Sequence, residues 1–91
     1  MSFSAVDPTL KDWALRSRMR LSTQYQDAEV RSFELVGPNG RAQIWVEVSA
    51  GITVHVWDYQ QRSQVFAVDN SALADGLDDA LRAAKAWCGT P

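Results

Sequence analysis

Residues 41–59 read RAQIWVEVSAGITVHVWDY and predict two antiparallel strands joined by a tight turn. Successive side chains of a strand point to opposite faces of a sheet, and here aliphatic residues alternate with aromatic and polar ones. One face would hold Ala42, Ile44, Val46, Val48, Ile52, Val54 and Val56. The other would hold Gln43, Trp45, Glu47, Thr53, His55, Trp57 and Tyr59. The stretch therefore predicts a sheet with one aliphatic face and one aromatic, polar face.

The loop between these two strands decides which residues pair. A three-residue loop over 49–51, with Gly51 free to adopt a positive φ, sets Val46 opposite Val54. A two-residue turn would instead set Glu47 beside Val54 and mix the two faces, because a one-residue slip exchanges them. Burial of the aliphatic residues therefore favours the three-residue loop.

A strand before this pair extends the sheet on one side. Residues 31–36 alternate in the same way, and the sequence GPNG at 37–40 is a strong turn signal. Closing that turn sets Phe33 opposite Ile44, on the aliphatic face. The polar residues 22–27 are interpreted as a connection between the first helix and this strand.

A strand after the pair extends the sheet on the other side. Residues 64–68 would follow a four-residue turn, with Val65 opposite Val56 and Ala67 on the same aliphatic face. This register leaves Phe66 among the aromatic and polar residues. The sheet is then a four-stranded antiparallel meander.

Two amphipathic helices flank the meander and would cover its aliphatic face. The first begins at Asp7-Pro8, since Asp caps free N–H groups and Pro suits the first helical position. Its apolar side would hold Leu10, Trp13 and Ala14. The second begins near Asp69 or Asp75 and ends before Gly89. Its apolar side would hold Leu73, Leu77, Ala80, Leu81, Ala84 and Cys88. We therefore expect one α+β domain over residues 1–91, with the element order α-β-β-β-β-α.

Composition narrows the class of protein. The chain has 91 residues, one cysteine and a net charge of −2. A single cysteine excludes an internal disulfide and a cysteine-based zinc site. The sequence contains no apolar run that could span a bilayer and no secretory signal at its start, which indicates a cytoplasmic protein with no membrane partner.

The acidic balance also argues against nucleic acid, whose phosphates require clustered cations. The order of helix, meander and helix resembles the double-stranded-RNA-binding domain in topology alone. That family places lysines where the second helix begins, whereas this chain has Asp69, Asp75, Asp78 and Asp79. We expect no nucleic-acid partner.

No group of residues predicts catalysis, a metal or a cofactor. His55 could act as a general base with Glu47 or Asp58 nearby, but no serine or cysteine is placed beside it. Asp75 and its neighbouring carboxylates are typical of a helix's first turns, and no cation-binding loop surrounds them. Cys88 falls on the apolar side of its helix. We therefore expect a protein that is not an enzyme.

The aromatic face is the strongest candidate for function, because exposed Trp and Tyr side chains dominate many protein interfaces. The candidate partner-binding residues are Trp45, His55, Trp57, Tyr59, Phe66, Glu34, Glu47 and Asp58. We expect a non-catalytic protein-binding domain, most concretely a small acidic inhibitor or toxin-immunity protein. The alternative is a homodimerising structural domain that uses the same face, and a small-ligand-binding protein or enzyme comes third.

Overall fold

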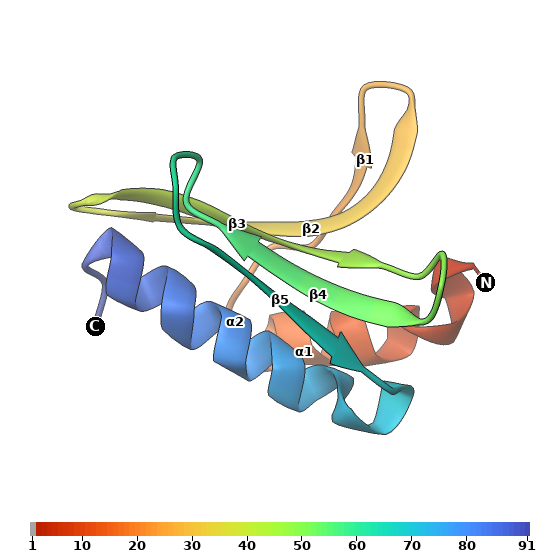
Figure 1. Cartoon of the computed structure of the whole chain (residues 1–91). Coiled ribbons are helices and arrows are strands. Elements are labelled where there is room, and N and C mark those ends of the chain that lie inside the picture. The colour runs from red at the N-terminus through yellow and green to blue at the C-terminus, as the bar shows by residue number, and fades with distance from the viewer. Residues whose placement is uncertain (1) are drawn as a thin grey trace.

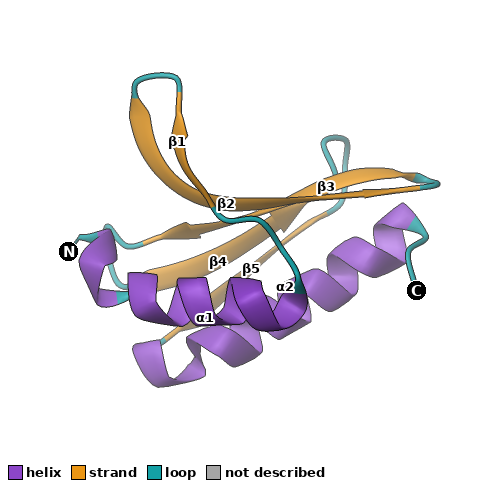
Figure 2. Cartoon of the chain, turned by 180° about the vertical axis from the view of Figure 1, so that it is seen from behind, coloured by secondary structure: helices purple, strands orange, loops and turns teal. Residues whose placement is uncertain are grey.

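The computed structural model describes residues 2–91, which form one antiparallel sheet with two helices packed on one of its sides (Figures 1 and 2). The helical elements are η1 (Phe3–Ala5), α1 (Asp7–Ser17), η2 (Asn70–Ala72) and α2 (Leu73–Cys88). The strands are β1 (Ser22–Tyr25), β2 (Ala28–Gly37), β3 (Gly40–Glu47), β4 (Ile52–Trp57) and β5 (Ser63–Val68). The α+β class and the two flanking helices are as the sequence predicts.

The centre of the sheet has the predicted register. Phe33 of β2 pairs with Ile44 of β3, and Val46 of β3 pairs with Val54 of β4. Gly51 in the loop between β3 and β4 has φ of 93°, a conformation that glycine adopts without steric cost. Alternation of apolar and polar residues therefore specified this register, because one face is buried and the other is not.

The sheet has five strands rather than the four predicted, since residues 22–25 form β1 instead of a connection. Tyr25 pairs with Ala28 across a tight turn in which Gln26 has φ of 53°. All four residues of β1 are exposed, so no alternation of apolar and polar residues marks this strand. The hairpin of β1 and β2 curls away from the rest of the sheet, on the side opposite the helices (Figure 1).

The register of β5 differs from the prediction by one residue. Trp57 pairs with Ser63 and Val54 pairs with Phe66, so the turn between the strands is one residue longer than expected. Tyr59 in this turn has φ of 66°. Phe66 therefore lies on the helix side of the sheet, and Val65, 59% exposed, lies on the aromatic side. Apolar residues at every position from 65 to 68 left the pattern unable to choose between the two registers.

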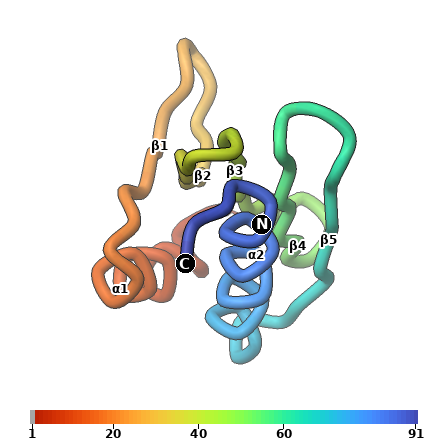
Figure 3. The backbone as a smooth tube through the Cα atoms, turned by 90° about the vertical axis from the view of Figure 1, so that its left-hand side faces the viewer, coloured from red at the N-terminus to blue at the C-terminus, as the bar shows by residue number. Residues whose placement is uncertain are grey.

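Both helices lie on the aliphatic side of the sheet and beside each other (Figure 3). Trp13 of α1 packs edge-on against Phe33, with ring centroids 4.9 Å apart, and its indole N–H donates to Asp78 Oδ1 of α2 at 2.8 Å. The Asp69 carboxylate caps η2 by accepting from the Ala72 backbone N–H at 2.9 Å. The fully buried core contains Val6, Leu10, Trp13, Ala42, Val54, Val56, Leu73, Leu77, Ala80 and Ala84. Within residues 2–91, no helix covers the face of the sheet away from α1 and α2 (Figures 1 and 2).

Candidate functional site

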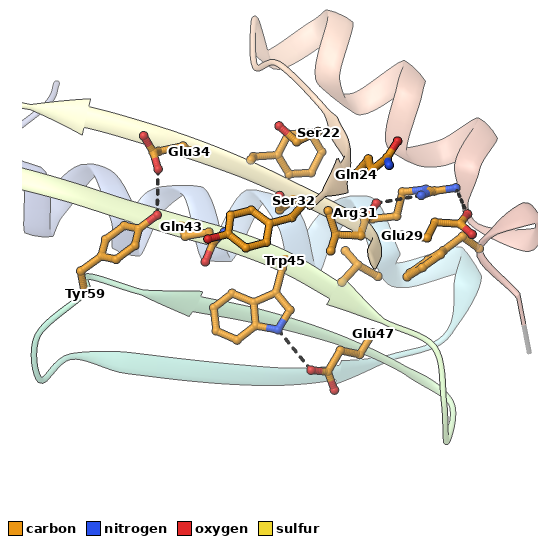
Figure 4. Close-up of a pocket in the computed structure, with 15 residues that line it drawn as sticks. Ser22, Gln24, Glu29, Arg31, Ser32, Glu34, Gln43, Trp45, Glu47 and Tyr59 are labelled. Carbon is orange, nitrogen blue, oxygen red and sulfur yellow. Dashed lines mark hydrogen bonds and ion pairs between the residues drawn. The ribbon is translucent and has the colours of Figure 1, made fainter. Parts of the chain in front are cut away.

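The uncovered face of the sheet is hollowed into a groove of about 620 Å³ (Figure 4). Its floor comes from β2 and β3, and the curled β1–β2 hairpin forms one side of it. We call this cavity the sheet groove. The residues that line it are Phe3, Ser22, Gln24, Tyr25, Glu29, Val30, Arg31, Ser32, Phe33, Glu34, Gln43, Trp45, Val46, Glu47 and Tyr59.

Aromatic rings are held in fixed positions along this face. Trp45 and His55, paired across β3 and β4, stack with centroids 4.8 Å apart and planes within 6° of parallel. Trp57 and Tyr59 contact each other at 4.8 Å with a tilt of 40°, and the Arg41 guanidinium lies 4.4 Å from the centre of the Tyr59 ring. Rings held in this way lose little conformational freedom when a partner binds.

Two glutamates of the sheet are tied to these rings. The Tyr59 hydroxyl donates to Glu34 Oε2 at 2.8 Å, and the Trp45 indole N–H donates to Glu47 Oε1 at 3.2 Å (Figure 4). Burial and the neighbouring Glu34 carboxylate raise the pKa of Tyr59 to about 12. Tyr59 therefore stays protonated at neutral pH and remains a hydrogen-bond donor.

Arg31 holds the groove's hairpin to the rest of the domain. Its side chain is only 8% exposed, and the guanidinium donates to both carboxylate oxygens of Asp7 at 2.7 and 3.1 Å and to Glu29 Oε1 at 2.8 Å. It also donates to the backbone carbonyls of Val30 at 2.7 Å and Thr23 at 3.4 Å. One side chain thus joins α1, β1 and β2. The hydrogen bonds from Arg31 outweigh burial and lower the pKa of the Asp7 carboxyl.

The structure brings together half of the predicted binding residues. Four of them line the sheet groove, namely Trp45, Tyr59, Glu34 and Glu47. His55 stacks on Trp45 and Trp57 contacts Tyr59 at a tilt, but neither His55 nor Trp57 lines the cavity.

Two predicted residues lie elsewhere. Phe66 is on the helix side of the sheet, partly buried against the core, because the register of β5 is shifted. Asp58 lies in the turn before β5, where its carboxylate accepts from the Gln60 and Arg62 backbone N–H groups and pairs with the Arg62 side chain at 2.9 Å. Burial opposes ionisation of Asp58, but the hydrogen bonds from Arg62 and Gln60 outweigh it and lower the pKa of the carboxyl. Asp58 thus serves to shape the turn.

The sequence interpretation missed the residues that the β1–β2 hairpin contributes. Ser22, Gln24 and Tyr25 belong to a strand that was assigned as a connection, and Glu29 lies before the predicted start of β2. Tyr25, an aromatic residue just before the polar pair Gln26-Asp27, was the one local signal of a hairpin.

The contacts of His55 do not form a catalytic arrangement. The Thr53 hydroxyl at 3.2 Å and Glu47 Oε2 at 3.5 Å both approach the same ring nitrogen, Nε2. A nucleophile and an orienting carboxylate would have to use opposite nitrogens of the ring. His55 therefore acts here as a stacking partner of Trp45.

Other reactive groups are similarly engaged or isolated. Burial raises the pKa of the Cys88 thiol, which lies in the core, so it is a poor nucleophile. Within residues 2–91, no three His, Cys, Asp or Glu side chains gather closely enough to hold a metal ion. No helix in the same range is long and apolar enough to cross a membrane.

Comparisons with protein-family models, with curated proteins and with solved structures give no match for this chain.

Proposed function

We propose that the chain is a cytoplasmic, non-catalytic protein-binding domain that holds a basic partner protein in the sheet groove. An inhibitor or a toxin-immunity protein is the concrete form of this function. One observation carries the proposal: the groove is an uncovered concave surface in which fixed aromatic rings stand beside carboxylates. Rigid aromatic anchors next to charged groups are typical of binding hot spots and not of a merely solvated sheet face.

The charge of the groove indicates the charge of the partner. Three carboxylates line it, Glu29, Glu34 and Glu47, against one guanidinium, Arg31. That guanidinium is already neutralised by Asp7 and Glu29. A surface with excess negative charge attracts a basic patch and steers its association at low salt.

A homodimer that uses the same face is the alternative. Two copies placed face to face would bring their carboxylates toward one another, and like charges disfavour such a contact. The alternative is therefore the weaker of the two, and it predicts a dimer whose stability rises with salt concentration. A basic partner predicts the opposite salt dependence.

The test compares two tryptophan variants. The tagged protein retrieves its partner from cells of the source organism, and affinity is then measured with purified components by calorimetry. Trp45→Ala should weaken binding by about thirtyfold, which corresponds to about 2 kcal/mol for a central aromatic anchor. Trp87→Ala is the matched control, because Trp87 lies on α2 under the Arg62 side chain, in the opposite layer.

Melting curves separate binding from folding in the same variants. Trp45→Ala should cost only about 1 kcal/mol of stability, the value of a cross-strand aromatic contact. If the Trp45 variant is folded and binds the partner as tightly as the wild type does, the sheet groove is not the binding surface. A protein that is dimeric by light scattering, and becomes monomeric with Trp45→Ala, would support the homodimer instead.

A further inference from the structure

We infer that the sheet groove takes the side chain of an arginine of the partner, stacked on Trp45 and hydrogen-bonded at the groove floor. This inference rests on the proposed function and specifies which residue of the basic partner is recognised. It follows from three features of the groove: a Trp45 ring on which His55 is the one aromatic stacking partner within residues 2–91, acceptor atoms that the domain leaves available, and cations that are already paired.

The first feature is the indole of Trp45. In the sheet, Ser32 of β2 and His55 of β4 pair with Trp45 on its two sides. His55 stacks on the indole and lies outside the groove, so Trp45 borders the cavity with its opposite side. A planar guanidinium is the cation best suited to stack on such a ring.

The second feature is a set of polar atoms that the domain leaves available. Ser32 is only 9% exposed, lines the groove, and makes no side-chain hydrogen bond to any other residue of the range 2–91. Tyr59 occupies Oε2 of Glu34, which leaves Oε1 to accept from a ligand. Ser32 pairs with Trp45 across β2 and β3, and Glu34 pairs with Gln43 two residues further along and lies beside Tyr59 (Figure 4). Acceptor oxygens at separate positions along the groove match the several N–H donors of a guanidinium.

The third feature is that the arginines in and beside the groove are already engaged by other side chains of the domain. Arg31 is held by Asp7 and Glu29 and lies over the Phe3 ring, 4.4 Å from its centre. Arg41 stacks on Tyr59 at the same distance and is not among the lining residues. Two aromatic rings that line the groove, Phe3 and Tyr59, thus already carry an arginine, whereas Trp45 has no such contact with a cation within residues 2–91.

Lysine fits this arrangement less well. Its ammonium is a compact, strongly hydrated charge that cannot stack as a plane or reach several separated acceptors at once. We therefore expect the groove to distinguish arginine from lysine, and arginine from its neutral analogue citrulline, which has nearly the same shape.

The experiment is an NMR titration of the intact protein with acetyl-Gly-Arg-Gly-amide. The indole N–H signal of Trp45 and the backbone signals of Ser32 and Glu34 should move together as the peptide is added. The affinity of the citrulline peptide should be lower by a factor of at least about ten, since that peptide lacks the cation–π contact and the charge-assisted hydrogen bonds. The affinity of the lysine peptide should lie between those of the arginine and citrulline peptides.

Two variants and a control test whether the arginine peptide binds in the sheet groove. Trp45→Leu and Glu34→Gln should each reduce the response to the arginine peptide, whereas Val65→Ala, on the same face but outside the groove, should leave it unchanged. Amide spectra of each variant report whether it is folded. Equal responses to the arginine and citrulline peptides, or shifts confined to residues outside the groove, would overturn the inference.

The outcome is separable from that of the proposed function. If Trp45→Ala abolishes binding of the partner protein but the arginine peptide produces no response, the groove is the interface and only the arginine inference fails. If the peptide binds as expected and Trp45→Ala leaves the partner's affinity unchanged, the groove binds guanidinium but is not the partner site.

Discussion

Replacing Asp7 by Asn should destabilise this domain far more than the same change at Asp12, although both aspartates belong to α1. Asp7 accepts two hydrogen bonds from Arg31, at 2.7 and 3.1 Å, and the Arg31 side chain is 8% exposed. Asn keeps the shape of the side chain and one oxygen acceptor, but it removes the charge and the second acceptor. Arg31 would then have only Glu29, whose side chain is 67% exposed, as a charged partner.

The loss of stability expected for Asp7→Asn follows from the burial of the Arg31 side chain. Losing one charge-assisted hydrogen bond, and leaving a buried guanidinium partly uncompensated, should cost about 2 to 3 kcal/mol. For a domain of this size that corresponds to a fall in Tm of about 10 to 20 °C. Asp12 pairs with Arg16 at 3.0 Å, with side chains 68% and 58% exposed. Asp12→Asn should therefore cost less than about 0.5 kcal/mol, as exposed pairs do.

Thermal unfolding followed by circular dichroism measures both variants, and pH provides a second test. Because the folded pKa of Asp7 is lowered, its ion pair contributes stability at pH values above its unfolded pKa, about 3.9. That contribution is lost as the pH falls through the folded pKa. The gap in Tm between the wild type and Asp7→Asn should thus be full at pH 7 and shrink below pH 4. Equal melting temperatures for the Asp7 and Asp12 variants would refute the role assigned to Arg31.

Three further outcomes are expected. Val54→Asp should unfold the domain, since it places an unpaired charge at a fully buried site. Thr53→Asp, on the uncovered face, should cost only about 1 kcal/mol of stability. Equal melting temperatures for the two variants would contradict the register. Tyrosine absorbance should show Tyr59 ionising near pH 12. Glu34→Gln should lower the pKa of Tyr59, because it removes the carboxylate charge and the hydrogen bond to it that raise this pKa. An unchanged titration would refute the contact between Tyr59 and Glu34. No binding to duplex RNA or DNA should be measurable at physiological salt, and a salt-sensitive gel shift at low micromolar protein would show otherwise.

The order of strands β2 to β4 could be predicted because each contributes one buried and one uncovered face. Val54 and Val56 are fully buried while His55 between them is partly exposed, and this alternation is what the sequence displays. The same pattern located Trp45, Tyr59, Glu34 and Glu47 on the face that carries the groove. Phe66 was misplaced because its neighbours on both sides are also apolar, so a shift of one residue has no visible cost in the pattern.

The sequence by itself determined the α+β class, the central register, the position of both helices and the existence of an aromatic face. These depend on periodicity within each segment, which burial imposes residue by residue. The tertiary structure alone decided that residues 22–25 form a strand and that the face is concave. The strand is exposed on both sides, and the hairpin is anchored by Arg31 to Asp7, 24 residues away in the chain. Contacts of that kind leave no period in the sequence, because their energy depends on two distant segments meeting in the folded state.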